Sequence, residues 1–119
     1  MEYKIKFTNI SLSDNLKKLI FKKTNWIEKF LGIKDFSIVL GVEFEKLTSR
    51  QHKGRVFRVE LNLPLPGRTL RVEKTSDDMI KAIDEAKDVL KKEIKTYKEK
   101  IKRKEEKNFR KIKISSRNE

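Results

Sequence analysis

The chain has 119 residues, with 31 Lys or Arg against 18 Asp or Glu, so its formal net charge at pH 7 is +13. This length suits one domain with a modest core, and the absence of cysteine excludes a disulfide scaffold, a thiolate metal site and a cysteine nucleophile. The sequence has neither the roughly 18-residue apolar run that a membrane span needs nor a signal peptide, so we expect a cytoplasmic protein whose charge favours nucleic acid over anionic lipid.

Residues 2–9 alternate between apolar side chains and lysines, which predicts a half-buried strand. Ser13 is the predicted N-cap of a helix that follows. Apolar residues then recur at helical spacing until Gly32, which supplies a C-terminal stop. We therefore expect one continuous helix over residues 14–31.

The middle of the chain alternates again. Residues 36–44 and 57–63 predict two strands, separated by a polar loop, and residues 68–74 predict a short fourth strand. The run 64–67 contains two prolines and a glycine and predicts a turn. A second helix is expected to begin at Ser76, with Asp77 and Asp78 opposing its dipole. Its apolar stripe consists of Met79, Ile83, Ala86, Leu90, Ile94, Tyr97 and Ile101.

This order, β-α-β-β-β-α, predicts an α+β fold. Both helices can bury their stripes only against the apolar face of the strands, which gives a two-layer sandwich, a four-stranded sheet with two helices packed on one face. We place the folded domain at residues 1–101. Residues 102–119 form a basic C-terminal tail that we expect to be flexible in the free protein, because it has too little apolar surface to offset its ordering entropy.

Lysines gather on one side of each predicted helix. At 100° per residue from the apolar stripe, those of the second helix fall between about 60° and 140°, at Lys87, Lys91, Lys95, Lys98 and Lys102. Lys18, Lys22 and Lys29 share one flank of the first helix. A solvated face is the ordinary explanation for such a run. Like charges at i, i+4 repel each other, however, and a polyanion would relieve that repulsion.

Other residues allow two interpretations. Lys23 lies inside the apolar stripe of the first helix, where it either extends along the core edge or directs its ammonium toward a phosphate between the helices. We expect Trp26 and Tyr97 to pack at the core edge, while Phe21 is the better candidate for stacking on bases. His52 has no second ligand nearby in sequence. We expect no enzyme, no metal site, no cofactor and no small-molecule substrate.

The second helix resembles one family. Its segment 76–98 has an acidic cap, then Asp78-Met79 and Ala82-Ile83-Asp84, then a lysine-rich stretch. This is similar to the D-M-x-x-A-I-D and K-L-x-R-Q-L-x-K-x-K pattern of the ribosome hibernation-promoting factors, which include ribosome-associated inhibitor A and are also called the sigma-54 modulation protein family. Ser13 and the segment 27–30 also match the first helix of that family. The resemblance covers about residues 1–100.

The resemblance implies binding to the small ribosomal subunit, with rRNA contacts at the A and P sites in the channel for messenger and transfer RNA. This would block translation and protect idle ribosomes. Lys23, Lys29, Lys92 and Lys98 match basic family positions, whereas Val89, Thr96 and Trp26 depart from them. The chain also looks like a short form without a second, ribosome-pairing domain.

The full set of expected contacts joins the lysine flanks to the matched positions. The expected rRNA-binding residues are Lys18, Lys22, Lys23, Lys29, Lys87, Lys91, Lys92, Lys95, Lys98 and Lys102. The expected tail contacts are Arg103, Lys104, Lys107, Arg110 and Lys111.

Two alternatives remain at this point. The first is a double-stranded RNA-binding domain, which forms a similar sandwich with the order α-β-β-β-α; the leading strand at residues 2–9 argues against it. The second is a protein-interaction module that modulates a transcription factor through its sheet or its tail.

Overall fold

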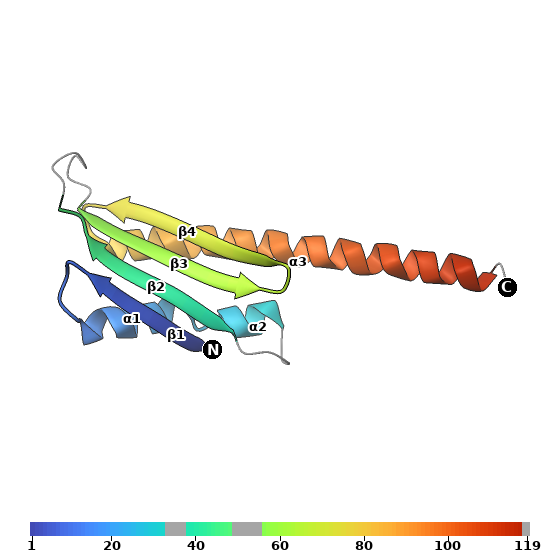
Figure 1. Ribbon diagram of the computed structural model, residues 1–119, viewed down its shortest axis with the longest axis horizontal. Helices are drawn as coiled ribbons and strands as arrows, with labels where there is room; N and C mark the ends of the chain where they lie inside the picture. The colour runs from blue at the N-terminus through green and yellow to red at the C-terminus, as the bar shows by residue number, and fades with distance from the viewer. Residues whose placement is uncertain (33–37, 49–55, 118–119) are drawn as a thin grey trace.

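A computed structural model describes the backbone of residues 1–32, 38–48 and 56–117, and the side chains of these ranges as far as residue 108. The strands are β1 (Glu2–Thr8), β2 (Val39–Lys46), β3 (Phe57–Leu65) and β4 (Arg68–Ser76). The helices are α1 (Asp14–Thr24), α2 (Ile27–Leu31) and α3 (Met79–Arg117). Figure 1 shows all three helices on one side of a single sheet, which confirms the predicted two-layer α+β sandwich.

The sheet has the order β1-β2-β3-β4 and is mixed. β1 pairs with β2 in parallel, with Ile5 opposite Val42, whereas β2–β3 and β3–β4 are antiparallel. A parallel pair requires a crossover connection, and α1 and α2 supply it. This crossover places α1 and α2 beside α3 on the same face of the sheet (Figure 1).

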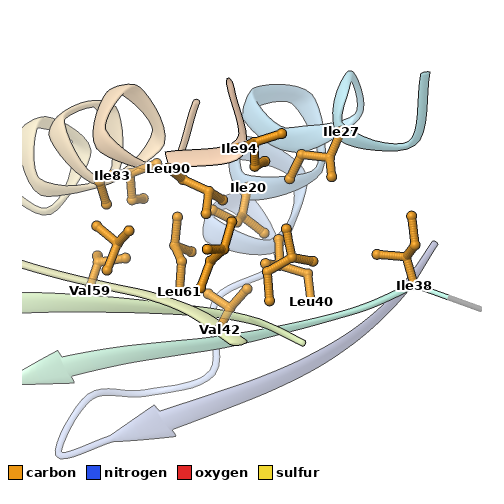
Figure 2. Packing of buried hydrophobic residues seen from close by; sticks show 14 of the residues in the cluster. Ile20, Ile27, Ile38, Leu40, Val42, Val59, Leu61, Ile83, Leu90 and Ile94 are labelled. Atoms are coloured by element: carbon orange, nitrogen blue, oxygen red, sulfur yellow. The ribbon is translucent and has the colours of Figure 1, made fainter. Parts of the chain in front are cut away.

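The core lies between the sheet and the helices, as Figure 2 shows. Alternate residues of β2 and β3 point inward, because side chains of a strand alternate between its two faces. Leu40, Val59 and Leu61 are fully buried, and they meet Leu90 and Ile94 of α3, which are also fully buried. The predicted apolar stripe of α3 therefore forms the helical side of the core as far as Tyr97, whereas Ile101 is exposed.

The first helical segment is interrupted, in contrast to the continuous helix that its periodicity predicts. α1 ends at Thr24 and α2 begins at Ile27. The Thr24 hydroxyl donates to the Ile20 carbonyl at 2.6 Å, and the Trp26 indole N–H donates to the Lys23 carbonyl at 2.6 Å. Both bonds lie at the break, where side chains that bond to backbone carbonyls compete with the helical ladder.

Several element boundaries differ from their predicted positions, and two of these differences concern Ser76 and Pro64. Ser76 ends β4 rather than capping α3, and the cap is Asp78, whose carboxylate accepts from the Ile80 N–H at 2.9 Å. Pro64 lies within β3, opposite Thr69, so the predicted turn narrows to Pro66 and Gly67. In a two-residue hairpin the second pair from the turn is a non-hydrogen-bonded pair, so the missing N–H of Pro64 removes nothing from the ladder.

α3 continues to Arg117, well past the predicted domain boundary at residue 101. Figure 1 shows this end of the helix projecting beyond the sheet, and the molecule measures 68 Å along its longest axis. Residues 101–108 are all exposed. The proposed division into a domain and a flexible tail stays a prediction. Phe36 and His52 lie outside the described residues.

Candidate nucleic-acid interface

One flank of α3 faces α1 and α2, and it carries the lysines that helical spacing groups together. The Lys91 ammonium lies 5.7 Å from the centre of the Trp26 ring, and the Lys98 ammonium lies 4.6 Å from the centre of the Phe30 ring. Lys98 also donates to the Phe30 carbonyl. We call this side of α3, with Lys87, Lys91, Lys95, Lys98 and Lys102, the interhelical flank.

The side chain of Lys23 connects α1 to α3. Its ammonium lies 2.8 Å from a carboxylate oxygen of Asp84 on α3, and its side chain is 29% exposed. Neither sequence interpretation included an acidic partner, although Asp84 is part of the motif that carries the resemblance. Because Asp84 neutralises Lys23, this lysine joins α1 to α3 in the free protein and contributes less to an external positive field than its position predicts.

The other basic residues of α1 and α2 point away from the core. Lys18, Lys22 and Lys29 are exposed, and no ion pair involves them within the described ranges. Lys22 lies in the last turn of α1, where the helix dipole favours a cation. These lysines and the exposed Lys95 of α3 form the outer surface of the helical layer, with charges available to an external partner.

Not every predicted contact lies on this surface. Lys87 is partly buried, and its ammonium lies 3.2 Å from a carboxylate oxygen of Asp88. Both features make this lysine less available to an external phosphate. Lys92 projects on the opposite side of α3, next to Arg68 of β4, and so does not belong to the interhelical flank.

The basic end of α3 stands clear of the sandwich. Lys102, Arg103, Lys104 and Lys107 are exposed on it. Arg110 and Lys111 lie on the same helix, but their side chains are outside the described part of the structure.

The aromatic residues mostly pack within the protein. Trp26 is partly buried against Phe30, with ring centres 5.7 Å apart, and Tyr97 is buried. Phe21 is 41% exposed, but its ring packs edge-on against Tyr3 at 4.7 Å. This places Phe21 beside β1 rather than on the outer surface of α1, which weakens its candidacy for stacking on bases.

The outer face of the sheet contains a charge network that sequence analysis does not identify. Arg58 donates to Glu43 at 2.8 Å, to Glu45 at 3.3 Å and to Glu73 at 2.7 Å, and it also donates to Glu60. Partial burial alone would lower the pKa of Arg58. The hydrogen bonds to the glutamates outweigh this effect and raise the pKa above its ordinary value. In the sequence, polar residues that alternate along a strand indicate only a solvated face. The register between the strands is what brings Arg58 and the glutamates together.

This network makes the two faces of the molecule electrostatically different. On the sheet face, carboxylates and cations neutralise one another, whereas the helical layer and the end of α3 carry an excess of lysine and arginine. An extended surface of this kind attracts a polyanion through phosphate neutralisation and release of counterions.

Two further observations concern the described residues. They contain no cluster of three or more His, Cys, Asp or Glu side chains that could hold a metal ion. None of their helices is both long enough and apolar enough to cross a membrane.

Comparison with known proteins places this surface in context. Residues 3–102 match the model of the family described as sigma 54 modulation protein / S30EA ribosomal protein. Ribosome hibernation promotion factors of Deinococcus radiodurans and Lactococcus lactis subsp. cremoris are each 27% identical to the chain, over 97 and 104 residues. These alignments cover 81% and 87% of the chain but only 48% and 53% of the relatives, so the chain spans about half their length.

Solved structures share the fold. The N-terminal domain of Thermus thermophilus Protein Y aligns with a TM-score of 0.65 and 23% identity, covering 82% of this chain and 99% of that domain. A ribosomal subunit interface protein from Coxiella burnetii aligns with a TM-score of 0.62 and 24% identity, covering 82% and 98%. At these identities the likeness establishes the fold alone.

Proposed function

The chain belongs to the sigma 54 modulation protein / S30EA ribosomal protein family, and from this membership we propose that it is a ribosome hibernation factor. It binds the small ribosomal subunit in the channel for messenger and transfer RNA, with rRNA contacts at the A and P sites. By occupying this channel it prevents translation and protects the idle ribosome.

The observation that carries the proposal is the separation of charge between the two faces. A protein attracted to RNA by net charge alone needs no particular face. Here the sheet face is balanced around Arg58, so among the described residues the excess of positive charge lies on the helical layer and the end of α3. This layer presents exposed lysines on α1, α2 and α3 side by side, as a surface that follows phosphates in folded RNA would require.

Within this layer the lysines divide into two roles. Lys18, Lys22, Lys29 and Lys95 are exposed and supply phosphate contacts. Lys23 and Lys98 hold α1 and α2 against α3 through Asp84 and the Phe30 carbonyl, and so keep the spacing of the layer. Inhibition then follows from occupancy, and the mechanism needs no catalytic step.

A pair of charge-reversed variants tests the role of the helical layer. The first carries Lys18→Glu, Lys22→Glu and Lys95→Glu. The control carries Lys4→Glu, Lys6→Glu and Arg71→Glu on the sheet face, with the same change in net charge. At 0.15 M salt the Debye length is about 8 Å, so charges on the far face are largely screened. In co-sedimentation with small ribosomal subunits, we expect the helical variant to lose binding and the control to retain it. Equal loss in both would contradict a face-specific interaction.

Chemical footprinting of the small-subunit rRNA tests the location. Protection is expected around the A and P sites, and excess initiator transfer RNA with messenger RNA should remove it by competition. Protection elsewhere on the subunit would leave a general RNA-binding domain. Pull-down from nuclease-treated lysate separates the remaining alternative, because a partner retained after RNA removal indicates a protein-interaction module.

A further inference from the structure

A crevice lies between the turn that joins β3 to β4 and the side of α3 opposite the interhelical flank. It has a volume of about 160 Å³ and is lined by Arg68, Val89, Lys92, Glu93 and Thr96. Arg68 is absent from the contacts that the sequence predicts. Its position beside Lys92 results entirely from the packing of the turn against α3.

The turn is held against the helix by a hydrogen bond between segments distant in sequence. The Tyr97 hydroxyl donates to the Pro66 carbonyl at 2.7 Å, and Gly67 completes the turn at φ 80°. Arg68 is paired with the buried Leu65 across the turn, and paired residues share a face of the sheet. Arg68 therefore projects on the helical side, where it borders α3.

The crevice is electropositive. Arg68 and Lys92 are both exposed, and neither forms an ion pair with any residue that the structure describes. Glu93 is the single carboxylate among the lining residues, and it is partly buried. The Thr96 hydroxyl donates to the Lys92 carbonyl at 3.1 Å, so the cationic donors among the lining side chains are the Arg68 guanidinium and the Lys92 ammonium. An arginine fork beside a lysine suits a phosphate group.

The same side of α3 continues as a second basic row. At 100° per residue, Lys92, Lys100, Arg103 and Lys107 fall between about −80° and −160° from the apolar stripe, whereas the interhelical flank falls between about 60° and 140°. All four are exposed. α3 thus carries cations on two flanks that face away from each other.

We propose that Arg68 and Lys92 form a phosphate-binding site in this crevice, which takes a phosphodiester group of RNA. This inference rests on the proposed function for the identity of the RNA, and it extends that function. Because the site lies on the flank opposite the interhelical lysines, α3 lies between two RNA segments when the protein is bound, with one segment along each flank.

The test measures the salt dependence of binding to small ribosomal subunits for Arg68→Gln, Lys92→Gln and the double variant. Arg71→Gln is the control, because it removes the same charge from the same strand on the sheet face, where the side chain is 69% exposed. Loss of one phosphate contact reduces the slope of log K against log salt by about 0.7–0.9. Because both cations hold one phosphate, we expect that full reduction for the double variant, a smaller reduction for Arg68→Gln and no reduction for Arg71→Gln. The double variant should be weaker than wild type by less than the product of the two single effects.

Two outcomes would overturn the inference. If wild-type protein binds the subunit and Arg68→Gln has the same slope as Arg71→Gln, the crevice holds no RNA phosphate; absence of wild-type binding would instead refute the proposed function. The second arm titrates inorganic phosphate while NMR follows the Arg68 side-chain N–H. If free phosphate binds, but Arg68→Gln does not change the slope of log K against log salt for subunit binding, the crevice binds a free anion and the RNA contact is rejected.

Discussion

At the scale of single residues, the most constrained charge in the protein is Arg58. Its planar guanidinium donates to four glutamates from three strands, an arrangement that a lysine with a single ammonium cannot reproduce. Hydrogen bonds from Thr8 and then Arg58 lower the pKa of Glu43. The outer sheet face is therefore neutral because its groups are paired. Arg58 makes most of these pairs, with Lys6 and Arg71 adding longer contacts to Glu43 and Glu60.

Replacement of Arg58 by Met should destabilise the protein, because it leaves four glutamates close together with only the longer contacts from Lys6 to Glu43 and from Arg71 to Glu60. We expect a loss of about 1–3 kcal/mol in the free energy of unfolding at pH 7. Because its folded-state pKa is lowered, Glu43 stabilises the wild type above its ordinary pKa of 4.5, and this contribution disappears as the pH falls through the folded-state pKa.

Urea denaturation at pH 7 and near pH 3 checks this prediction. The difference between wild type and Arg58→Met should narrow at the lower pH, because protonation of Glu43 weakens both its attraction to Arg58 in the wild type and its repulsion of the neighbouring glutamates in the variant. The control is Arg71→Met, on the same face but 69% exposed, which should change stability little. A difference that does not depend on pH would contradict an electrostatic origin.

At the scale of elements, α3 combines three functions that its helical periodicity separates. Its buried stripe closes the core, its interhelical flank contacts α2 through Lys91 and Lys98, and its opposite flank borders the crevice at Arg68. Because these surfaces lie at different angles around one axis, stability and binding can be altered independently.

Leu90→Ala and Lys95→Ala should separate these two properties. Leu90 is fully buried between the helix and the sheet, so the truncation leaves a cavity and should cost about 2–5 kcal/mol in the free energy of unfolding. Lys95 is exposed, and its replacement should change stability by less than about 0.5 kcal/mol while weakening subunit binding. Thermal denaturation with co-sedimentation of each variant measures both effects. Destabilisation by Lys95→Ala would mean that the face assignment of α3 is wrong.

At the scale of the whole molecule, the basic end of α3 extends the charged surface beyond the sandwich (Figure 1). Among the residues of α3 whose side chains the structure describes, Tyr97 is the last that is buried, and residues 101–108 are exposed. As far as residue 108, the extension therefore adds charge and reach without adding to the core.

Deletion of residues 103–119 should leave the sandwich intact and weaken ribosome binding. We expect the thermal midpoint to stay within about 4 °C of that of the full chain, because the residues of this segment whose side chains are described, 103–108, are all exposed. The slope of log K against log salt should fall by about 0.7–0.9 for each lost phosphate contact. Circular dichroism and co-sedimentation at several salt concentrations provide the measurements. A large fall in the midpoint would show that the tail stabilises the domain.

Much of the fold could be predicted because burial has a local signature. Period two in β1 and β2 and the helical stripe from Met79 to Tyr97 each report the side that faces the core. The break between α1 and α2 could not be predicted from periodicity, because the apolar stripe continues through it. The Thr24 hydroxyl and the Trp26 indole bond to backbone carbonyls at the break, but the Thr96 hydroxyl makes the same kind of bond in the uninterrupted α3, so these residue types do not mark a break in the sequence.

The candidate site was predictable to the same extent and for the same reason. Helical spacing alone groups the lysines of α3, and the motif around Asp84 indicates the family. Together with the periodicity of the strands and helices, the sequence by itself determined the element order, the apolar faces and an excess of positive charge. The tertiary structure decided how the charges are paired. Lys23 meets Asp84, Arg58 meets the glutamates, and Arg68 comes beside Lys92. Apart from Arg58 and Glu60, which share β3, the residues brought together come from different elements, so their proximity depends on strand register and helix packing, which no local pattern encodes.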